Sequence, residues 1–211
     1  MPAAARFAEV ISSEEQLRAV VGLPAQRAVN KEIARLDAHC RMIISRSPFI
    51  LISSSDSEGR LDVSPKGDPA GFVQVLDEAT LAIPDRPGNR RADTFSNVLQ
   101  NPRVGLLFMI PGRQETLRVN GRALIVRDRA LRDKMAVNGK PPELALVVTV
   151  EQAFVHCGKC IIRSGLWDKE SWPDLGGLPS HARCLLDQAR VPDSVEAIEE
   201  SIRQAYRSRL Y

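Results

Sequence analysis

The sequence predicts a mainly β, α+β fold in which short strands form a closed or nearly closed antiparallel barrel with flanking helices. Short apolar runs recur along the middle of the chain, several of them with two-residue alternation. Turn residues separate these runs at hairpin spacing, and helical periodicity is largely confined to the two ends of the chain. Many short strands with few helices between them are typical of barrels rather than of parallel sheets.

The individual elements follow from these patterns in chain order. The predicted strands cover 49–53, 61–64, 72–75, 80–83, 104–110, 116–126 and 144–155. The predicted helices cover 12–21, 26–40, 92–100, 128–137 and 157–166, with a last amphipathic helix that starts at 192–193. The rest of 158–192 is expected to be rich in loops. We therefore expect residues 1–45 to form an N-terminal helical arm packed on the barrel, and residues 46–211 to form the barrel domain with a C-terminal helical and loop extension.

The composition restricts the class of partner. The chain has 211 residues, with 29 Lys and Arg against 26 Asp and Glu, and only 5% aromatic residues. A nucleic-acid-binding protein usually has a strongly basic stripe with aromatic side chains, so we expect no nucleic-acid partner. No run approaches the ~18–20 apolar residues of a membrane span, and no apolar leader is visible at the N-terminus. These features predict a cytoplasmic protein without a membrane partner.

The segment 84–91 is the most informative motif. It places Gly88 and the adjacent Arg90 and Arg91 directly before the predicted helix 92–100. Backbone N–H groups, guanidinium forks and the positive end of a helix can together surround an anion such as a phosphate. The motif is not a P-loop, because no Gly-Lys-Ser/Thr follows. Taken alone, two adjacent arginines also fit a solvated basic turn.

Four segments widen this pattern. In chain order they are Asp-Val-Ser-Pro-Lys-Gly-Asp at 62–68, Asp-Arg-Pro-Gly-Asn-Arg-Arg at 85–91, Asn-Pro-Arg-Val-Gly-Leu-Leu-Phe at 101–108 and Glu-Thr-Leu-Arg-Val-Asn-Gly at 115–121. Their order resembles the pyridoxamine 5′-phosphate oxidase-like superfamily of flavin-binding proteins, in particular its FMN-dependent branch, over about residues 40–170. The resemblance implies a six-stranded antiparallel FMN-binding split barrel, and a homodimer with the flavin at the subunit interface.

The resemblance also implies residues for the phosphate end of the flavin. The second strand carries a basic residue to the phosphate, which matches Lys66 here. The loop before the helix supplies further phosphate contacts, which match Asn89, Arg90 and Arg91. Arg forms bidentate hydrogen bonds to phosphate oxygens and Lys adds a point charge, so these residue types suit the chemistry.

At the ring end, the strand after the Pro-Gly turn carries a polar residue toward the isoalloxazine edge, best matched by Thr116. The stretch 156–167 matches a recurrent feature of this branch and is expected near the flavin, from the partner subunit. We expect Lys159, Arg163 and Trp167 to border the open face of the ring, with Lys159 or Arg163 available to orient an anionic substrate.

The implied function is an FMN-dependent oxidoreductase that performs two-electron chemistry on a small molecule. No catalytic residue is assigned, because the cofactor itself carries the chemistry. The C-terminus lacks the basic and aromatic pattern with which true pyridoxamine phosphate oxidases bind substrate, so vitamin B6 oxidation is not implied. Two alternatives stay open, a non-catalytic flavin carrier or sensor and a reductase that uses the deazaflavin F420.

The cysteines offer a competing motif. Cys157, Cys160, His181 and Cys184 have the residue types and CxxC spacing of a tetrahedral structural zinc site. The apolar residues that follow Cys160 instead suggest a packed helix, in which the cysteines are small core residues. We therefore expect no metal.

Overall fold

The computed structural model describes residues 6–211, and the chain divides into two compact units, Met1–Glu32 and Ile33–Tyr211. In the first unit, α1 (Glu14–Val21) begins after Ser13, whose hydroxyl accepts a hydrogen bond from the Gln16 backbone N–H at 3.2 Å. This side-chain cap satisfies one of the free N–H groups of the first turn. A short helix, α2 (Gln26–Asn30), follows.

The second unit contains the sheet. Its elements are α3 (Ala38–Arg46), β1 (Phe49–Ser55), β2 (Leu61–Gly67), β3 (Gln74–Val75), β4 (Thr80–Pro84), α4 (Asp93–Gln100), β5 (Arg103–Met109), β6 (Thr116–Val126), α5 (Arg129–Lys134), β7 (Ala145–His156), α6 (Lys159–Ser164), the 3₁₀ turn Lys169–Ser171, α7 (His181–Ala189) and α8 (Val195–Ser208). Most lie within two residues of their predicted bounds.

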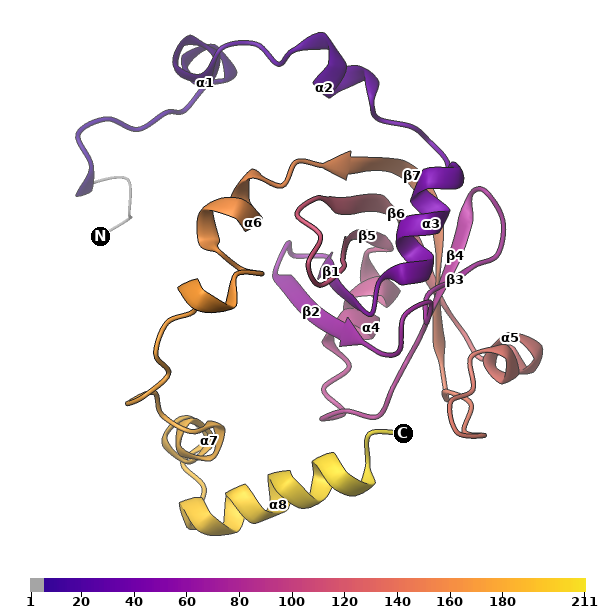
Figure 1. The fold of residues 1–211 in the computed structure, drawn as a ribbon, viewed down its shortest axis with the longest axis vertical. Coiled ribbons are helices and arrows are strands. Elements are labelled where there is room, and N and C mark those ends of the chain that lie inside the picture. Colours follow the sequence, from indigo (N-terminus) through magenta and orange to yellow (C-terminus); the bar gives the residue numbers. More distant parts are fainter. Residues whose placement is uncertain (1–5) are drawn as a thin grey trace. The chain divides into compact units, whose positions relative to one another are not determined.

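The strands form one antiparallel sheet in the order β2-β1-β5-β6-β7-β4-β3 (Figure 1). This confirms the mainly antiparallel α+β fold with flanking helices and agrees with a split barrel. The sheet has seven strands because the two-residue β3 extends the six longer ones. Within residues 6–211, β2 and β3 stay unpaired with each other, so the ring of hydrogen bonds is not closed.

The two long strands β6 and β7 join the halves of the sheet. β5 pairs with the first part of β6, and β4 pairs with the first part of β7. The β6–β7 register shifts between Asn120 and Gly121. A Cβ atom on Gly121 would lie 2.0 Å from the Thr149 carbonyl oxygen, so only glycine permits this close approach. The irregularity bends the strands where the two halves meet.

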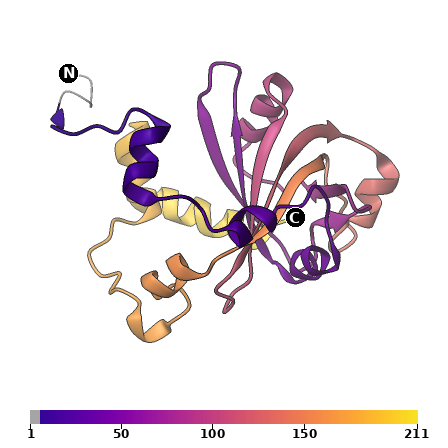
Figure 2. The same ribbon diagram turned by 90° about the horizontal axis from the view of Figure 1, so that it is seen from above.

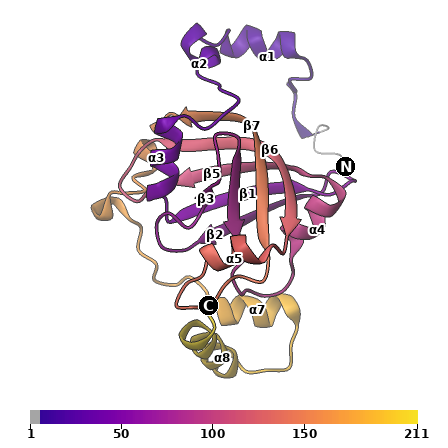
Figure 3. The ribbon, with the colours of Figure 1, turned by 90° about the vertical axis from the view of Figure 1, so that its right-hand side faces the viewer.

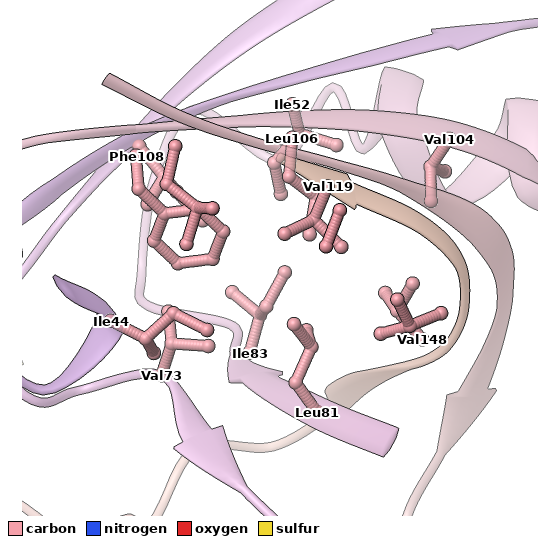
Figure 4. Close-up of a cluster of buried hydrophobic side chains, with 14 of the residues drawn as sticks. Ile44, Ile52, Val73, Leu81, Ile83, Val104, Leu106, Phe108, Val119 and Val148 are labelled. Carbon is pink, nitrogen blue, oxygen red and sulfur yellow. The ribbon is translucent and has the colours of Figure 1, made fainter. Parts of the chain in front are cut away.

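The core lies on the concave side of the sheet. Leu106, Phe108 and Val119 point inward from β5 and β6 toward Leu81 and Ile83 of β4 (Figure 4). Cys40, Ile43 and Ile44 of α3 and Val98 of α4 belong to the same buried cluster. Burial of these side chains, at roughly 25 cal/mol per Å² of apolar surface, is the main term that stabilises the unit.

The predicted helix 26–40 is wrong. Val29, Ile33 and Leu36 have helical spacing, but the chain leaves α2 at Asn30 and Ile33 pairs with Ala153 of β7 through two backbone hydrogen bonds of 2.7 and 3.0 Å. The next helix, α3, begins only after Asp37, whose carboxylate caps the Cys40 N–H at 2.8 Å. Tertiary pairing therefore overrides a local helical pattern.

Two further segments differ from expectation. The strand predicted over 72–75 is reduced to β3, because Phe72 and Val73 turn into the core instead of continuing the ladder. The predicted loop region 158–192 contains α7, which Ser180 caps by accepting from the Arg183 N–H at 3.2 Å. Helix α7 packs against α8 (Figure 3). No helix within residues 6–211 is long and apolar enough to cross a lipid bilayer.

Candidate functional site

Strand β2 presents a polar row to one side of the sheet. Asp62, Ser64 and Lys66 are half-buried, while the alternate residues of the strand are exposed, as the two-residue period of a strand requires. The Lys66 ammonium donates to the Ser64 hydroxyl at 2.9 Å. Lys66 is paired in register with the buried Ile50 of β1, so it lies on the inward face at the edge of the sheet.

The loop between β4 and α4 reaches this row. Arg90 and Ala92 have φ values of +62° and +57°, a left-handed conformation that non-glycine residues adopt at a cost. The Asn89 side-chain oxygen accepts from the Arg91 N–H at 3.0 Å, and the Arg91 guanidinium donates to Asp93 at 2.8 Å. Within residues 6–211, Arg90 has no hydrogen-bond or ion-pair partner for its side chain. Of the two adjacent arginines, Arg91 is therefore paired and Arg90 is free.

Helix α4 fixes the loop against β2. The Thr94 hydroxyl is buried and donates to the Asp62 carboxylate at 2.9 Å. Ala92, at the start of α4, gives no side-chain cap, so N–H groups of the first turn stay free to bind an anion. No local motif marks Thr94 in the sequence, because its hydrogen-bond partner Asp62 is 32 positions away.

These elements line one cavity of about 1430 Å³. Its walls are residues 62–66 of β2, residues 85–95 around the loop, residues 139–143 after α5, and residues 205, 206 and 209–211 at the end of α8 and after it. Lys66, Arg90 and Arg209 all line it, and among the described residues none of the three forms an ion pair with a carboxylate. The cavity therefore brings together, from three separate segments, three cations that form no ion pair among the described residues.

The charge of the cavity also depends on the carboxylates that line it. Burial raises the pKa of Asp85 above its usual value, and the positive charges of Lys66 and Arg86 act in the opposite direction. Asp85 lines the same cavity, as do the carboxylates of Asp62, Asp93 and Glu143. Arg86, by contrast, is committed to a buried ion pair with Asp68 at 2.6 Å and also donates to the Met135 carbonyl at 2.8 Å.

The predicted site residues fall into two groups. Lys66, Asn89, Arg90 and Arg91 come together as walls of the cavity. Thr116, Lys159, Arg163 and Trp167 are not among the residues that line it.

The second group lies near the start of β6 and around α6, in the same unit. Thr116 is buried at the start of β6 and pairs with His156 of β7, directly before α6. The Trp167 indole N–H donates to the Arg113 carbonyl at 2.8 Å and ties the segment after α6 to the β5–β6 turn. Lys159 and Arg163 are exposed on α6, and neither has an ion-pair partner within residues 6–211.

The cysteine motif remains scattered. Cys157 and Cys160 are exposed, and Cys184 is half-buried on α7. The expectation that Cys160 and Cys184 are small core residues is therefore wrong, because α6 turns Cys160 outward and buries Ile161 instead. Among residues 6–211 no group of three or more His, Cys, Asp or Glu side chains is arranged to hold a metal ion.

A family model described as pyridoxamine 5′-phosphate oxidase matches residues 36–157, which is more than half of the chain. The chain belongs to this family. The matched range contains β1 to β7, α4 and the loop with Arg90, and it ends before α6. The polar row of β2 and the arginine loop are therefore parts of the family's own core.

The chain is also similar to several solved structures. HupZ from Group A Streptococcus is 17% identical, with 56% of this chain and 92% of that chain covered at a TM-score of 0.46. An F420 reductase is 17% identical, with 54% and 94% covered at a TM-score of 0.40. An FMN-binding protein from Syntrophomonas wolfei is 10% identical, with 55% and 86% covered at 0.41. No curated protein matches the sequence.

Proposed function

We propose that this protein binds FMN through its phosphate in the cavity between β2, the 85–92 loop and α4, and that it acts as an FMN-dependent oxidoreductase. The observation that carries the proposal is the convergence of Lys66 and Arg90, both free of carboxylate partners, on one cavity beside an uncapped helix start. A phosphate dianion supplies the charge that this arrangement lacks.

The residues present fit the phosphate group. Arg90 offers a free guanidinium fork, Lys66 adds a point charge from β2, and the first turn of α4 adds backbone donors. Arg91 contributes less, because its guanidinium is already shared with Asp93. The backbone at Arg90 and Ala92 is left-handed, and the contacts of Asn89 and Asp93 with Arg91 help to hold the loop in this shape. Bound FMN would supply two-electron transfer, and the chain supplies position and charge.

We further propose that a second copy of the chain completes the site. Leu61 and Val63 of β2 are 82% and 62% exposed on the outer face of the sheet, and Phe49, at the other end of the β1–β2 pair, is also exposed. An apolar surface of this kind is typical of an interface. In a homodimer, Thr116 and the α6 segment of the partner would border the ring whose phosphate lies in this cavity, with Lys159 or Arg163 orienting an anionic substrate.

The first experiment compares ligands that differ only in the phosphate. Fluorescence-quenching titrations should give a much higher affinity for FMN than for riboflavin. Arg90→Ala should weaken FMN binding by about tenfold or more, since a hydrogen bond to a charged group contributes ~1.5–3 kcal/mol. Arg91→Ala should have a smaller effect because of Asp93.

Arg129→Ala is the matched control, because Arg129 is an exposed arginine of α5 outside the cavity. Equal affinity of the wild type for FMN and riboflavin, or an Arg90 variant that behaves like the Arg129 control, would contradict the proposed phosphate site.

A second experiment separates an enzyme from a carrier or sensor, and FMN from F420. The FMN-loaded protein is mixed anaerobically with NADPH, NADH or reduced F420, and bleaching of the flavin band is followed. Rapid reduction by one donor, slowed in Lys159→Ala or Arg163→Ala while FMN stays bound, supports the enzyme. Absence of reduction by every donor, together with no turnover in a substrate screen, favours the carrier. Tighter binding of F420 than of FMN favours the deazaflavin.

A further inference from the structure

The end of α8 and the residues after it form one wall of the cavity. Tyr206, Arg209 and Tyr211 line it together with β2 and the arginine loop. Helix α8 is yellow in Figure 2, and Figure 3 shows it below the strands, with the chain end between α8 and α5. This segment lies more than 45 residues beyond the range that the family model matches, 36–157. Its contribution to the cavity is therefore a feature of this chain's own extension.

Tyr211 fastens the segment to the sheet. Its hydroxyl donates to the buried Asp68 carboxylate at 2.7 Å, while the other Asp68 oxygen accepts from Arg86 at 2.6 Å. The Arg86 guanidinium lies 5.6 Å from the centroid of the Tyr211 ring, within the range of a cation–π contact. On the other side, the Lys140 ammonium donates to the Tyr211 main-chain oxygen at 3.1 Å. The segment is thus tied to both walls of the cavity.

Two arginines on α7 and α8 have carboxylate partners, since Arg183 pairs with Asp187 at 2.9 Å and Arg203 pairs with Glu200 at 2.9 Å. Arg207 and Arg209 form no ion pair among the described residues, and of these two only Arg209 lines the cavity. Arg209 has no side-chain partner among the described residues, although it lines a cavity that also contains the free Arg90. A phosphate monoester presents three terminal oxygens, each of which can accept more than one hydrogen bond, so Lys66, Arg90 and the first turn of α4 leave room for a further donor. A third cation from a separate segment matches that geometry.

We propose that Arg209 determines the specificity of the cavity for ligands with a terminal phosphate monoester, by contacting the anion held between Lys66 and Arg90. Tyr211 is the positioning residue that holds Arg209 in place through Asp68 and Arg86. This inference rests on the proposed function and adds to it a contact from outside the family core. Because Arg209 interacts with the phosphate alone, it acts on the affinity for phosphorylated ligands and leaves the affinity for their dephosphorylated forms unchanged.

The test uses the full chain and titrates FMN and riboflavin in parallel. Arg209→Gln should lower FMN affinity by about tenfold, the loss of one charge-assisted hydrogen bond, without changing riboflavin affinity. Arg209→Lys should restore part of the loss. Tyr211→Phe, which keeps the ring and removes the hydroxyl, should cause a smaller loss that is again confined to FMN. A merely structural role of Tyr211 would change both affinities.

Arg207→Gln is the matched control, because it removes the same charge from the same end of α8 without touching the cavity wall. If Arg209→Gln and Arg207→Gln bind FMN equally, the inference is overturned, while a retained preference of the wild type for FMN leaves the proposed function intact. If the wild type shows no such preference, the proposed function fails. Calorimetric titration with inorganic phosphate then tests Arg209 separately. Loss of phosphate binding in Arg209→Gln but not in Arg207→Gln supports the role of Arg209. Equal phosphate binding by the two variants overturns it.

Discussion

The core of the sheet and the cavity at its edge are held together by different kinds of interaction. The core consists of apolar side chains from neighbouring strands, each in contact with several others, and it is nearly free of charge. The cavity is lined by charged, polar and apolar side chains from four separate segments, and a few directional contacts hold its charged groups. Apolar packing tolerates small adjustments, whereas a hydrogen bond or ion pair fails when one partner is removed. The core therefore governs stability, and the cavity governs what is bound.

The largest expected effect is the loss of stability when a core side chain is truncated. Leu106 of β5 is 1% exposed and Leu99 of α4 is 79% exposed. Leu106→Ala should lower the free energy of unfolding by about 2–5 kcal/mol, because the lost transfer energy adds to the cost of a cavity. Leu99→Ala removes the same atoms from an exposed site and should change little. Urea denaturation of both variants provides the measurement, and similar midpoints for the two would contradict the comparison.

The second-largest expected effect is the loss of stability when the buried ion pair at the edge of the cavity loses one partner. Arg86→Met removes the partner of Asp68, whose side chain is 1% exposed, and leaves a buried carboxylate with only the Tyr211 hydroxyl. The expected loss of stability is about 3 kcal/mol. The exposed pair of Arg183 and Asp187 gives the control, since Arg183→Met should cost about 0.5 kcal/mol or less.

A double variant sharpens this second prediction. Asp68→Asn removes the charge that Arg86→Met leaves unpaired, so the double variant should be more stable than Arg86→Met alone. If thermal unfolding shows that the two losses simply add, the cost does not come from a buried unpaired charge.

The smallest effect concerns the reactivity of a core thiol. Burial, followed by the hydrogen bond to the Asp37 carboxylate, raises the pKa of Cys40 from 9.0 to about 11. The protonated thiol is favoured in the folded state, so its contribution to stability is present below the ordinary pKa and is lost as pH rises through about 11. At pH 8, a thiol reagent should modify the exposed Cys157 and Cys160 first, and Cys40 only after unfolding. Mass mapping that finds Cys40 labelled at the rate of Cys157 would contradict this.

Local sequence patterns predicted much of this architecture. The alternation over 104–110, 116–126 and 144–155 identifies β5, β6 and β7 to within one residue at most ends, because strand periodicity depends only on neighbours in the chain. The same is true of the arginine loop, where a turn, two arginines and a helix start are consecutive. That these arginines and Lys66 bind a phosphate stays a prediction.

Only the tertiary structure decided the contacts between distant segments. Ile33 carries a helical pattern but joins β7, since pairing with Ala153 satisfies its backbone groups. Thr94 meets Asp62, and Tyr211 meets Asp68 across 143 positions, although nothing in either local sequence marks a partner. Sequence periodicity reports which face of an element is apolar, and it contains no information about which distant polar group will lie opposite. The sequence by itself therefore determined the strands and the arginine loop, while folding decided that Arg209 lines the same cavity as Lys66 and Arg90.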